Sequence, residues 1–159
     1  MAGCEVCADN ETVEAGLDGG AIARLRTGYV KLPPTQYFRG YVTFSAKTCA
    51  PELHELPPTE RALFLEEMAA VAHAMWSALA PRKLNYELLG NGAAHLHWHL
   101  FPRYEDDPHP GGPVWEDLNF LRNLWTRGGT LAPGELDELR RAILVELQQE
   151  NVSIERMFI

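Results

Sequence analysis

The stretch NYELLGNGAAHLHWHLFPRY, residues 85–104, decides the fold and holds half of the six histidines in the chain. His95, His97 and His99 occupy every second position, and apolar residues fill the places between and after them. An alternation with period two is typical of a half-buried strand, so the three imidazoles are expected on one face of a sheet. Pro102 lacks the N–H that a sheet ladder needs and is expected to end the strand.

Three imidazoles on one strand face can serve as a polar surface, a metal site or a catalytic group. Same-face residues lie about 6.5–7 Å apart along a strand, so one zinc with bonds of about 2.0–2.1 Å can accept two of them if the rings lean inward. A third ligand from the same straight strand is poorly placed for that metal. The spacing therefore favours catalysis, in which one imidazole attacks and its neighbours orient, protonate or bind.

The motif HLHWHLF (residues 95–101) resembles the His-φ-His-φ-His-φ-φ signature of the histidine triad nucleotide hydrolases and transferases, where φ is an apolar residue. The resemblance runs from Cys4 to about Trp115 and includes the segments FRGYVTF (38–44) and ELHEL (52–56). It implies an α+β fold in which one long helix packs across a meandering antiparallel sheet and a C-terminal helical appendage follows. It also implies a homodimer.

Cleavage at the α-phosphorus of a nucleotide requires a nucleophile that is uncharged at pH 7, and neutral imidazole meets that requirement. His97 lies between the other two histidines and matches the nucleophile of the family, which implies a nucleotidyl-histidine intermediate. His99 is expected to bind a phosphate or ester oxygen as a donor. The resemblance implies a hydrolase or transferase acting on dinucleoside polyphosphates, such as diadenosine tetraphosphate, or on nucleoside phosphoramidates.

The loop at residues 90–92, Gly-Asn-Gly, offers backbone N–H groups and a side-chain amide to a phosphate. Asn91 and Gly92 are therefore expected to contact substrate, and Asn85 is expected to face its ribose or phosphate. The chain departs from the family pattern in having a shorter loop here and Tyr41 where a further histidine is common. These departures leave open an alternative, a nucleotide- or zinc-binding regulatory protein with the same fold and little turnover.

The pair Cys4-x-x-Cys7 indicates metal or redox chemistry rather than a disulfide scaffold. A redox motif would need a thioredoxin-like strand and helix, which residues 8–20 do not indicate. Relatives with such a pair often hold a structural zinc with it, together with a histidine before the main helix and the first triad histidine. Here Cys49 stands at the position of the former, so the resemblance implies a Cys₃His zinc site of Cys4, Cys7, Cys49 and His95. The alternative is a packed turn without metal.

Residues 20–31 and 37–47 are predicted strands, because polar and apolar residues alternate in both, and the segment PPT (33–35) connects them. The main helix is predicted between Thr59, its expected N-cap, and Pro81, which ends it. Its apolar face repeats with helical spacing. That face consists of Leu63, Phe64, Met68, Val71, Ala72, Met75, Trp76 and Leu79.

The remainder of the chain is predicted to be a loop at 105–113, a short ordered segment at 114–116 and a second amphipathic helix at about 133–150. The family core ends before this helix, so the helix is expected to pack on the outside of the domain or at a subunit interface. We therefore divide the chain into a histidine triad domain, residues 1–115, and a C-terminal extension packed on it, residues 116–159.

The net charge of −8, from 14 basic and 22 acidic residues, argues against broad electrostatic binding of nucleic acid. A nucleotide can still bind where a pocket presents N–H donors. No apolar run approaches the ~20 residues of a membrane helix, and the first residues lack the basic and apolar regions of a signal peptide. A cytoplasmic location without membrane association is therefore expected.

Overall fold

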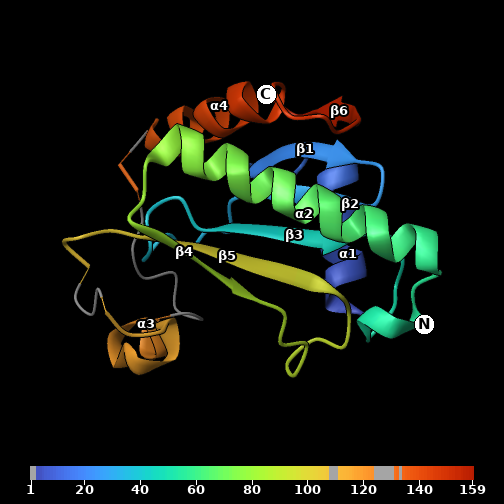
Figure 1. Ribbon diagram of the computed structural model, residues 1–159, viewed down its shortest axis with the longest axis horizontal. Helices are drawn as coiled ribbons and strands as arrows, with labels where there is room; N and C mark the ends of the chain where they lie inside the picture. The colour runs from blue at the N-terminus through green and yellow to red at the C-terminus, as the bar shows by residue number, and fades with distance from the viewer. Residues whose placement is uncertain (1–2, 108–110, 124–130, 133) are drawn as a thin grey trace.

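A computed structural model describes residues 3–107, 111–123, 131–132 and 134–159. Six strands form one antiparallel sheet in the order β4-β5-β3-β2-β1-β6 (Figure 1). The strands are β1 (Ala21–Leu25), β2 (Gly28–Lys31), β3 (Val42–Ala46), β4 (Lys83–Glu87), β5 (His97–Arg103) and β6 (Ile154–Met157).

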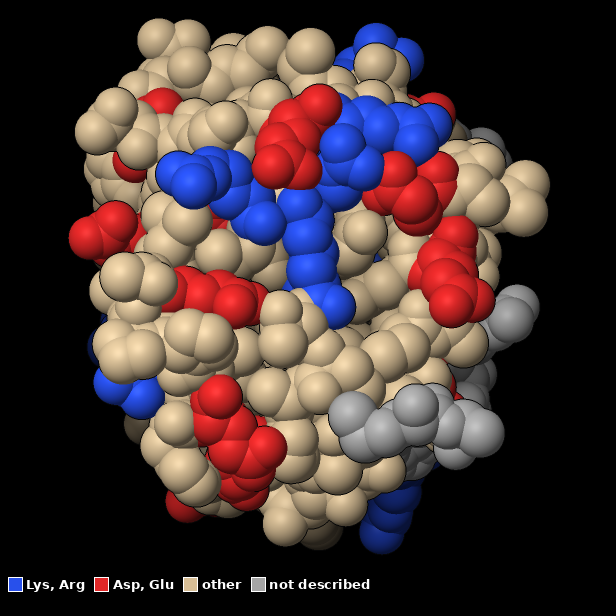
Figure 2. Space-filling view, turned by 90° about the vertical axis from the view of Figure 1, so that its right-hand side faces the viewer, with Lys and Arg blue, Asp and Glu red and all other residues tan. Residues whose placement is uncertain are grey.

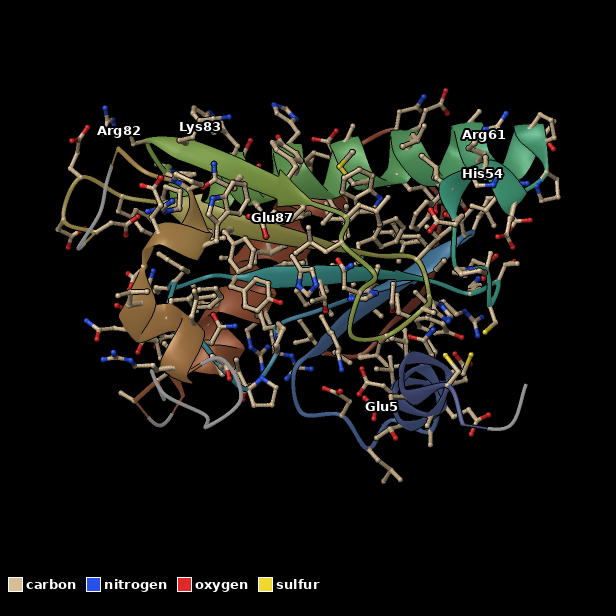
Figure 3. The ribbon with its side chains drawn as sticks, turned by 90° about the horizontal axis from the view of Figure 1, so that it is seen from below. Glu5, His54, Arg61, Arg82, Lys83 and Glu87 are labelled. Atoms are coloured by element: carbon tan, nitrogen blue, oxygen red, sulfur yellow. The ribbon has the colours of Figure 1, made fainter. Side chains whose placement is uncertain are left out.

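The long helix α2 (Pro58–Leu79) crosses one face of the sheet, and α4 (Glu135–Leu147) packs beside it (Figure 1). The helix α1 (Glu5–Glu14) lies against the opposite face, where Figure 3 shows Glu5 on the far side of the sheet from α2. The remaining helical segments are η1 (Leu53–Glu55), η2 (Val114–Glu116) and α3 (Leu118–Asn123). The predicted α+β class, an antiparallel sheet with one long helix across it, is confirmed.

Side chains alternate along β5 between the hydrophobic core on one face of the sheet and the histidine site on the other. Leu100 is fully buried on the α2 side of the sheet and belongs to the same cluster as Phe44 and Phe64, whose rings stack with centroids 5.0 Å apart. Each such fully buried side chain stabilises the fold by about 1.5–3 kcal/mol. His97 and His99 alternate with these residues and point to the opposite face, as the period of two predicts.

Two predictions about β5 are wrong at its ends. The strand begins at His97, so His95 lies in the preceding bend, where its N–H bonds to the Ala93 carbonyl. Pro102 lies inside the strand rather than ending it. Pairing with β3 stops at Leu100, so Pro102 has a strand partner on the β4 side alone. The missing N–H of Pro102 therefore leaves no gap in the ladder between β3 and β5.

Residues 20–31 form a hairpin, not the single strand that the alternation predicts. The turn between β1 and β2 is held by Glu67, a fully buried carboxylate on α2. Glu67 accepts hydrogen bonds from the N–H groups of Arg26 (3.0 Å) and Thr27 (2.9 Å) and from the Thr27 hydroxyl. Both carboxylate oxygens are therefore satisfied, and the hairpin turn is fixed to the long helix.

Residues 37–47 were predicted to be one strand, but only Val42–Ala46 pair in the sheet. Gly40 has a φ of +83°, and a Cβ there would lie 2.5 Å from Leu79 Cδ1, so the chain turns at this glycine before entering β3. The Gln36 side chain ties both sides of the turn, accepting from Gly40 N–H and donating to the Tyr41 carbonyl, each at 2.9 Å.

The main helix has the predicted extent but a different start. Pro57 is the N-cap without a side-chain hydrogen bond and Pro58 opens the first turn, so the predicted cap Thr59 is wrong. The helix ends at Leu79 ahead of Pro81, as expected. Trp76, predicted on the apolar face, is 46% exposed, which leaves a large aromatic surface on α2 without a covering element among the described residues.

Neither α1 nor β6 is predicted from sequence. The C-terminal extension is more than a helical appendage, because β6 adds a strand to the edge of the sheet beside β1. Helix α4 begins at Glu135; the predicted start at Pro133 and the centre of the predicted loop, 108–110, lie outside the described residues. The division at residue 115 stays a prediction, while Leu139 and Ile143 of α4 share the core of the sheet.

Charges of both signs are mixed on the surface. On the face in Figure 2, Lys and Arg side chains gather in one band, and Asp and Glu side chains border it. Acidic side chains therefore interrupt the basic ones, and the face in Figure 2 is not a continuous basic surface. Ion pairs of the described chain include Lys47 with Glu155 (2.7 Å) and Arg24 with the same carboxylate (3.1 Å). Within the described ranges, no helix is long and apolar enough to span a bilayer.

Candidate active site

His97 is held in one tautomer by the bend that precedes its strand. Its Nδ1 lies 2.6 Å from the carbonyl oxygen of His95, so Nδ1–H donates to that oxygen. In the unprotonated form of the ring, the lone pair is then on Nε2. The ring is half-buried and lines two hollows on the face opposite α2. An unprotonated imidazole that is fixed in this way and carries its lone pair on Nε2 can act as a nucleophile at pH 7.

His99 lies next to His97, with ring centroids 4.7 Å apart and the planes at 75°. Burial, together with the nearby imidazole of His97, lowers the pKa of His99 to about 4, so the ring is neutral at pH 7. Its Nδ1 is hydrogen-bonded to the hydroxyl of Tyr41. The sequence does not predict this contact, since it shows Tyr41 only as a departure from the family pattern.

The first hollow, about 270 Å³, lies between the two histidines and the polar face of β3. Its lining residues are Val6, Asp9, Lys31, Pro33, Pro34, Thr35, Tyr41, Thr43, Ser45, His97 and His99. Thr43 is 9% exposed, and its buried hydroxyl oxygen has no hydrogen-bond partner within the described part of the chain. A buried hydroxyl without a partner beside a reactive imidazole is suited to bind a polar group of a ligand.

The second hollow, about 520 Å³, lies on the other side of the histidines, against the glycine loop. It is lined by Glu5, Val6, Asp9, His97, His99 and residues 89–93. The structure therefore brings the predicted substrate residues Asn91 and Gly92 to the same space as the two histidines. The backbone and side-chain N–H groups of this loop are the available donors for a phosphate.

Asn85, the remaining predicted substrate residue, does not line either hollow beside the histidines. Its Oδ1 accepts a hydrogen bond from Arg103 (2.9 Å), and both residues line a separate hollow with Arg82 and Lys83. Figure 3 shows Arg82 and Lys83 at the end of β4 away from Glu87. A direct contact between Asn85 and a substrate at the histidines stays a prediction.

Sequence reasoning missed the contribution of α1. Val6 and Asp9 of this helix line both hollows, so α1 forms a wall of the site. Asn10 fixes the helix to β3, since its amide donates to the Ala46 carbonyl (3.0 Å) and accepts from the Ser45 hydroxyl (2.6 Å). Residues 5–14 carry few apolar side chains, and no periodicity in them pointed to a helix.

Cys4, Cys7, Cys49 and His95 come together at one end of α1, and their ligand atoms all lie within 4.8 Å of one another. The Nδ1 atom of His95 is 3.4 Å from Cys4 Sγ and 3.5 Å from Cys7 Sγ. All three cysteines are free thiols. The four ligands implied by the resemblance thus form one group in space.

The donor set suits a zinc ion. The other nitrogen of His95, Nε2, is 2.8 Å from the Ala46 carbonyl and donates to it, which leaves the Nδ1 lone pair facing the sulfurs. Burial and the neighbouring thiols of Cys49 and Cys4 raise the pKa of Cys7 to about 12. Burial and the neighbouring sulfurs thus oppose ionisation of Cys7. A cation bound among the sulfurs would offset this effect, because it stabilises the thiolate form that coordinates a metal.

His54 does not belong to this group. It is exposed, and its carbonyl accepts a hydrogen bond from Arg61 (3.5 Å) at the start of α2. Figure 3 shows both residues on the α2 side, far from Glu5 of α1. The backbone of His54 thus joins the segment before α2 to the first turns of that helix.

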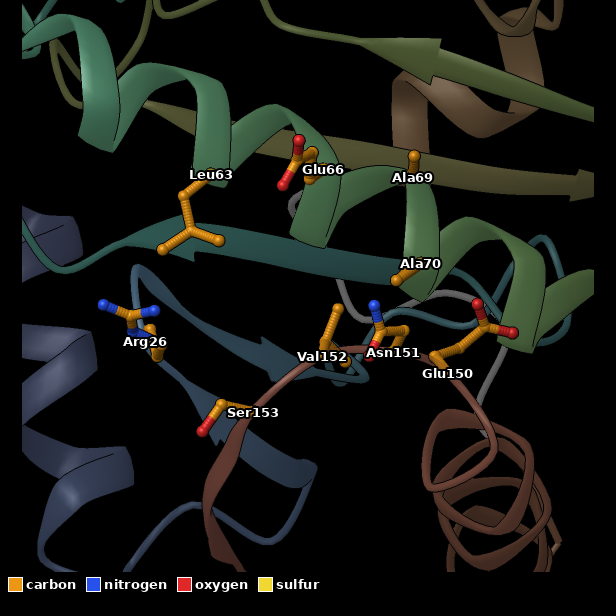
Figure 4. Close-up of a pocket in the computed structure, with 9 residues that line it drawn as sticks. All are labelled: Arg26, Leu63, Glu66, Ala69, Ala70, Glu150, Asn151, Val152 and Ser153. Carbon is orange, nitrogen blue, oxygen red and sulfur yellow. The ribbon is translucent and has the colours of Figure 1, made fainter.

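A larger hollow of about 780 Å³ lies between α2 and residues 150–153 (Figure 4). Its wall holds Arg26 and Glu66 but no histidine or cysteine. The sheet separates it from His97 and His99. Size alone therefore does not identify the active site; the reactive groups lie in the two smaller hollows.

The low pKa of His99 predicts a loss of stability in acid. The unfolded chain has a histidine pKa of about 6.5 and takes up a proton above the folded value of about 4, so the free energy of unfolding falls as pH drops through this window. The difference corresponds to about 3 kcal/mol at most. Urea unfolding between pH 7.5 and 4.5 should show a smaller decline for His99→Gln than for the wild type. The exposed His73→Gln serves as the control, and an unchanged slope in His99→Gln contradicts the prediction.

Comparisons with known proteins agree with this fold. The model of the HIT domain matches residues 40–106, which include β3, α2, β4 and β5. No curated protein matches the chain in sequence.

Three solved structures are similar over most of both chains. A histidine triad protein from Sinorhizobium meliloti 1021 is 26% identical, with 87% of this chain and 93% of that chain covered and a TM-score of 0.63. A histidine triad nucleotide-binding protein from Sulfolobus tokodaii strain7, described as hypothetical, is 15% identical, with coverage of 90% and 93% and a TM-score of 0.66. A Zn-bound histidine triad family protein from Mycobacterium smegmatis is 20% identical, with coverage of 92% and 94% and a TM-score of 0.57.

Proposed function

We propose that this protein, which carries the HIT domain of the histidine triad proteins over residues 40–106, is a nucleotide-binding hydrolase or transferase. Its reaction breaks a bond at the α-phosphorus of a dinucleoside polyphosphate or a nucleoside phosphoramidate. The observation that carries the proposal is the hydrogen bond from Nδ1–H of His97 to the His95 carbonyl. It leaves the lone pair of the unprotonated ring on Nε2, in a side chain that lines both hollows.

In the first step, Nε2 of His97 attacks the α-phosphorus, and the bond from phosphorus to the leaving oxygen or nitrogen breaks. The leaving group takes the bonding electron pair and a proton from solvent. The ring becomes a phosphorylated imidazolium, whose remaining N–H still donates to the His95 carbonyl and stabilises the positive charge. In the second step, water attacks phosphorus and gives up a proton to solvent, the P–N bond breaks with its electron pair returning to Nε2, and nucleoside monophosphate and the unprotonated His97 ring are released. In a transferase, another acceptor takes the place of water.

The remaining groups of the site stabilise charge rather than form bonds. His99 is neutral and can donate to a phosphate oxygen, and the loop at residues 90–92 adds backbone N–H groups. We propose that His99, Asn91 and Gly92 contact substrate. Cys4, Cys7, Cys49 and His95 would hold a zinc ion that fixes α1 to the sheet; when bound, it supplies structural stability.

An alternative function is a nucleotide- or zinc-binding regulatory protein with little turnover. Tyr41 in place of the histidine common in relatives, and the short loop, favour it. The hydrogen bonding of His97 favours the enzyme, since no binding role requires a nucleophile with a fixed, accessible lone pair. A homodimer and a cytoplasmic location are further proposals, and the exposed Trp76 on α2 supports the first.

A substrate panel tests the proposal. The protein is incubated with diadenosine tetraphosphate and with an adenosine phosphoramidate, quenched on the millisecond-to-second scale, and analysed as intact protein by mass spectrometry. We expect release of AMP from one substrate at least and a protein species heavier by one adenylyl group, located on His97 by peptide fragmentation. Binding of AMP without turnover or adduct would support the regulatory alternative. An adduct on another residue would contradict the assignment of the nucleophile.

A further inference from the structure

Tyr41 is buried beside the triad and packs against the rings of Phe101 and His99. Its side chain is 4% exposed. Its ring stacks on Phe101, with centroids 4.4 Å apart and planes at 14°, and lies 5.9 Å from the ring of His99 at 22°. Phe101 and His99 follow one another on the same face of β5. The phenol therefore has little freedom to move relative to the imidazole.

The backbone of Tyr41 is also fixed. Gln36, itself 4% exposed, accepts from the N–H of Gly40 and donates to the carbonyl of Tyr41. The N–H of Tyr41 donates to the Phe38 carbonyl at 2.9 Å. Both polar groups of the Tyr41 backbone are used within the turn, so the hydroxyl is presented to His99 from a rigid support.

The direction of the hydrogen bond between the two side chains follows from their protonation. Burial and the nearby carboxylate of Glu87 raise the pKa of Tyr41, so its hydroxyl keeps its proton. His99 is neutral and has one protonated and one unprotonated nitrogen. Within the described residues, His99 Nδ1 is the hydroxyl's only hydrogen-bond partner, so a donating Nδ1–H would leave the phenol proton buried without an acceptor. Tyr41 therefore donates, and Nδ1 accepts.

We propose that Tyr41 is a positioning residue, which fixes His99 in the tautomer that carries its proton on Nε2 and so directs a hydrogen-bond donor at the phosphate of the substrate. This inference rests on the proposed function for its substrate, but the tautomer itself is a property of the free protein. Under this proposal a tyrosine at this position supports catalysis by its contact with His99, so Tyr41 no longer favours the alternative with little turnover.

The effect on catalysis comes through orientation. Without the phenol, a neutral imidazole distributes its proton between both nitrogens and rotates more freely, so only part of the population presents a donor to phosphate. Removal of one positioned donor to the charge that develops in a transition state typically costs 10²–10³ in rate, and partial loss of its orientation costs less. We expect a tenfold to hundredfold lower kcat in Tyr41→Phe, with KM changed by about twofold at most.

The decisive experiment reads the tautomer directly. Wild-type and Tyr41→Phe proteins are labelled with ¹⁵N-histidine, and the two ring nitrogens of His99 are recorded by long-range ¹H–¹⁵N correlation at pH 7.5, with His99→Gln used for assignment. We expect a single Nε2–H tautomer in the wild type and a mixture of tautomers in Tyr41→Phe. The phenyl ring retains the stacking on Phe101, so the substitution removes the hydroxyl and little else.

Tyr37→Phe is the matched control. Tyr37 lies in the same aromatic cluster, but its hydroxyl donates to Asp117 (3.0 Å) and not to a histidine. This variant should leave the His99 tautomer and kcat unchanged. A pure Nε2–H tautomer that persists in Tyr41→Phe, or an equal shift in Tyr37→Phe, overturns the inference. If the wild type releases no nucleotide but the tautomer shifts only in Tyr41→Phe, the proposed function fails and the positioning role stands.

Discussion

His97→Ala is expected to lower nucleotide release at least about a thousandfold, while the protein keeps its fold and oligomeric state. The reason is that the substitution removes the atom that forms the covalent bond to phosphorus, Nε2 of a ring that the His95 carbonyl holds in one tautomer. His97 is only half-buried, so its truncation removes little core packing. Steady-state release of AMP and intact-protein mass spectrometry measure the rate and the loss of the adduct.

Two comparisons make this result specific. His99→Ala should retain more activity than His97→Ala, because water can replace a hydrogen-bond donor in part but cannot replace the nucleophile. His73→Ala, an exposed histidine on α2 paired with Glu150, should retain full activity. Added imidazole should restore part of the turnover of His97→Gly by occupying the vacated space. Activity of His97→Ala within tenfold of the wild type would refute the assignment.

The sequence was most informative where the repeat of apolar residues along a strand or helix shows which of its faces is buried in the core. In β5 the alternation of imidazole and apolar side chains predicts which face enters the core, and Leu100 and His99 lie as expected. The extent of α2 followed from its apolar repeat and from Pro81. These features depend on the spacing of apolar residues within one strand or one helix, and this spacing can be read from a single sequence.

Features that depend on contacts distant in sequence were not predictable. The hairpin of β1 and β2 exists because Glu67, some 40 residues later, binds the N–H groups of Arg26 and Thr27. Helix α1 has little apolar periodicity of its own and is placed by Asn10 and by the cysteine cluster. Strand β6 forms on an edge that β1 provides. In each case tertiary contacts override a weak local signal.

The candidate site divides in the same way. His97, Asn91 and Gly92 were found because they lie in one short stretch around the motif. The role of Tyr41 could not be found from the sequence, since 58 residues separate it from His99 and only the pairing of β3 with β5 brings them together. A signal was nevertheless present in the sequence: Tyr41, Thr43 and Ser45 alternate with the apolar Val42 and Phe44, and the three line the first hollow.

Removal of zinc is expected to lower the melting temperature by about 10 °C or more, which corresponds to a loss of unfolding free energy on the order of 3–5 kcal/mol. The reactivity of His97 as a nucleophile should be less affected than this stability. The four ligands come from α1 and the residue before it, the segment after β3 and the bend before β5, so one ion would join three segments that are far apart in the chain. Protein purified without chelator should hold about one zinc per chain by elemental analysis.

The variant Cys49→Ser tests the site without relying on chelators. It should hold much less zinc than the wild type and melt at a lower temperature, whereas the neighbouring Thr48→Ser should match the wild type in both respects. Because Val6 and Asp9 of α1 line both hollows beside His97, weaker attachment of this helix should also raise KM several-fold while the adduct still forms on His97. Metal-free protein whose melting temperature is unchanged by chelators would refute the zinc site and leave the cysteine pair as a packed turn on the helix that Asn10 joins to β3.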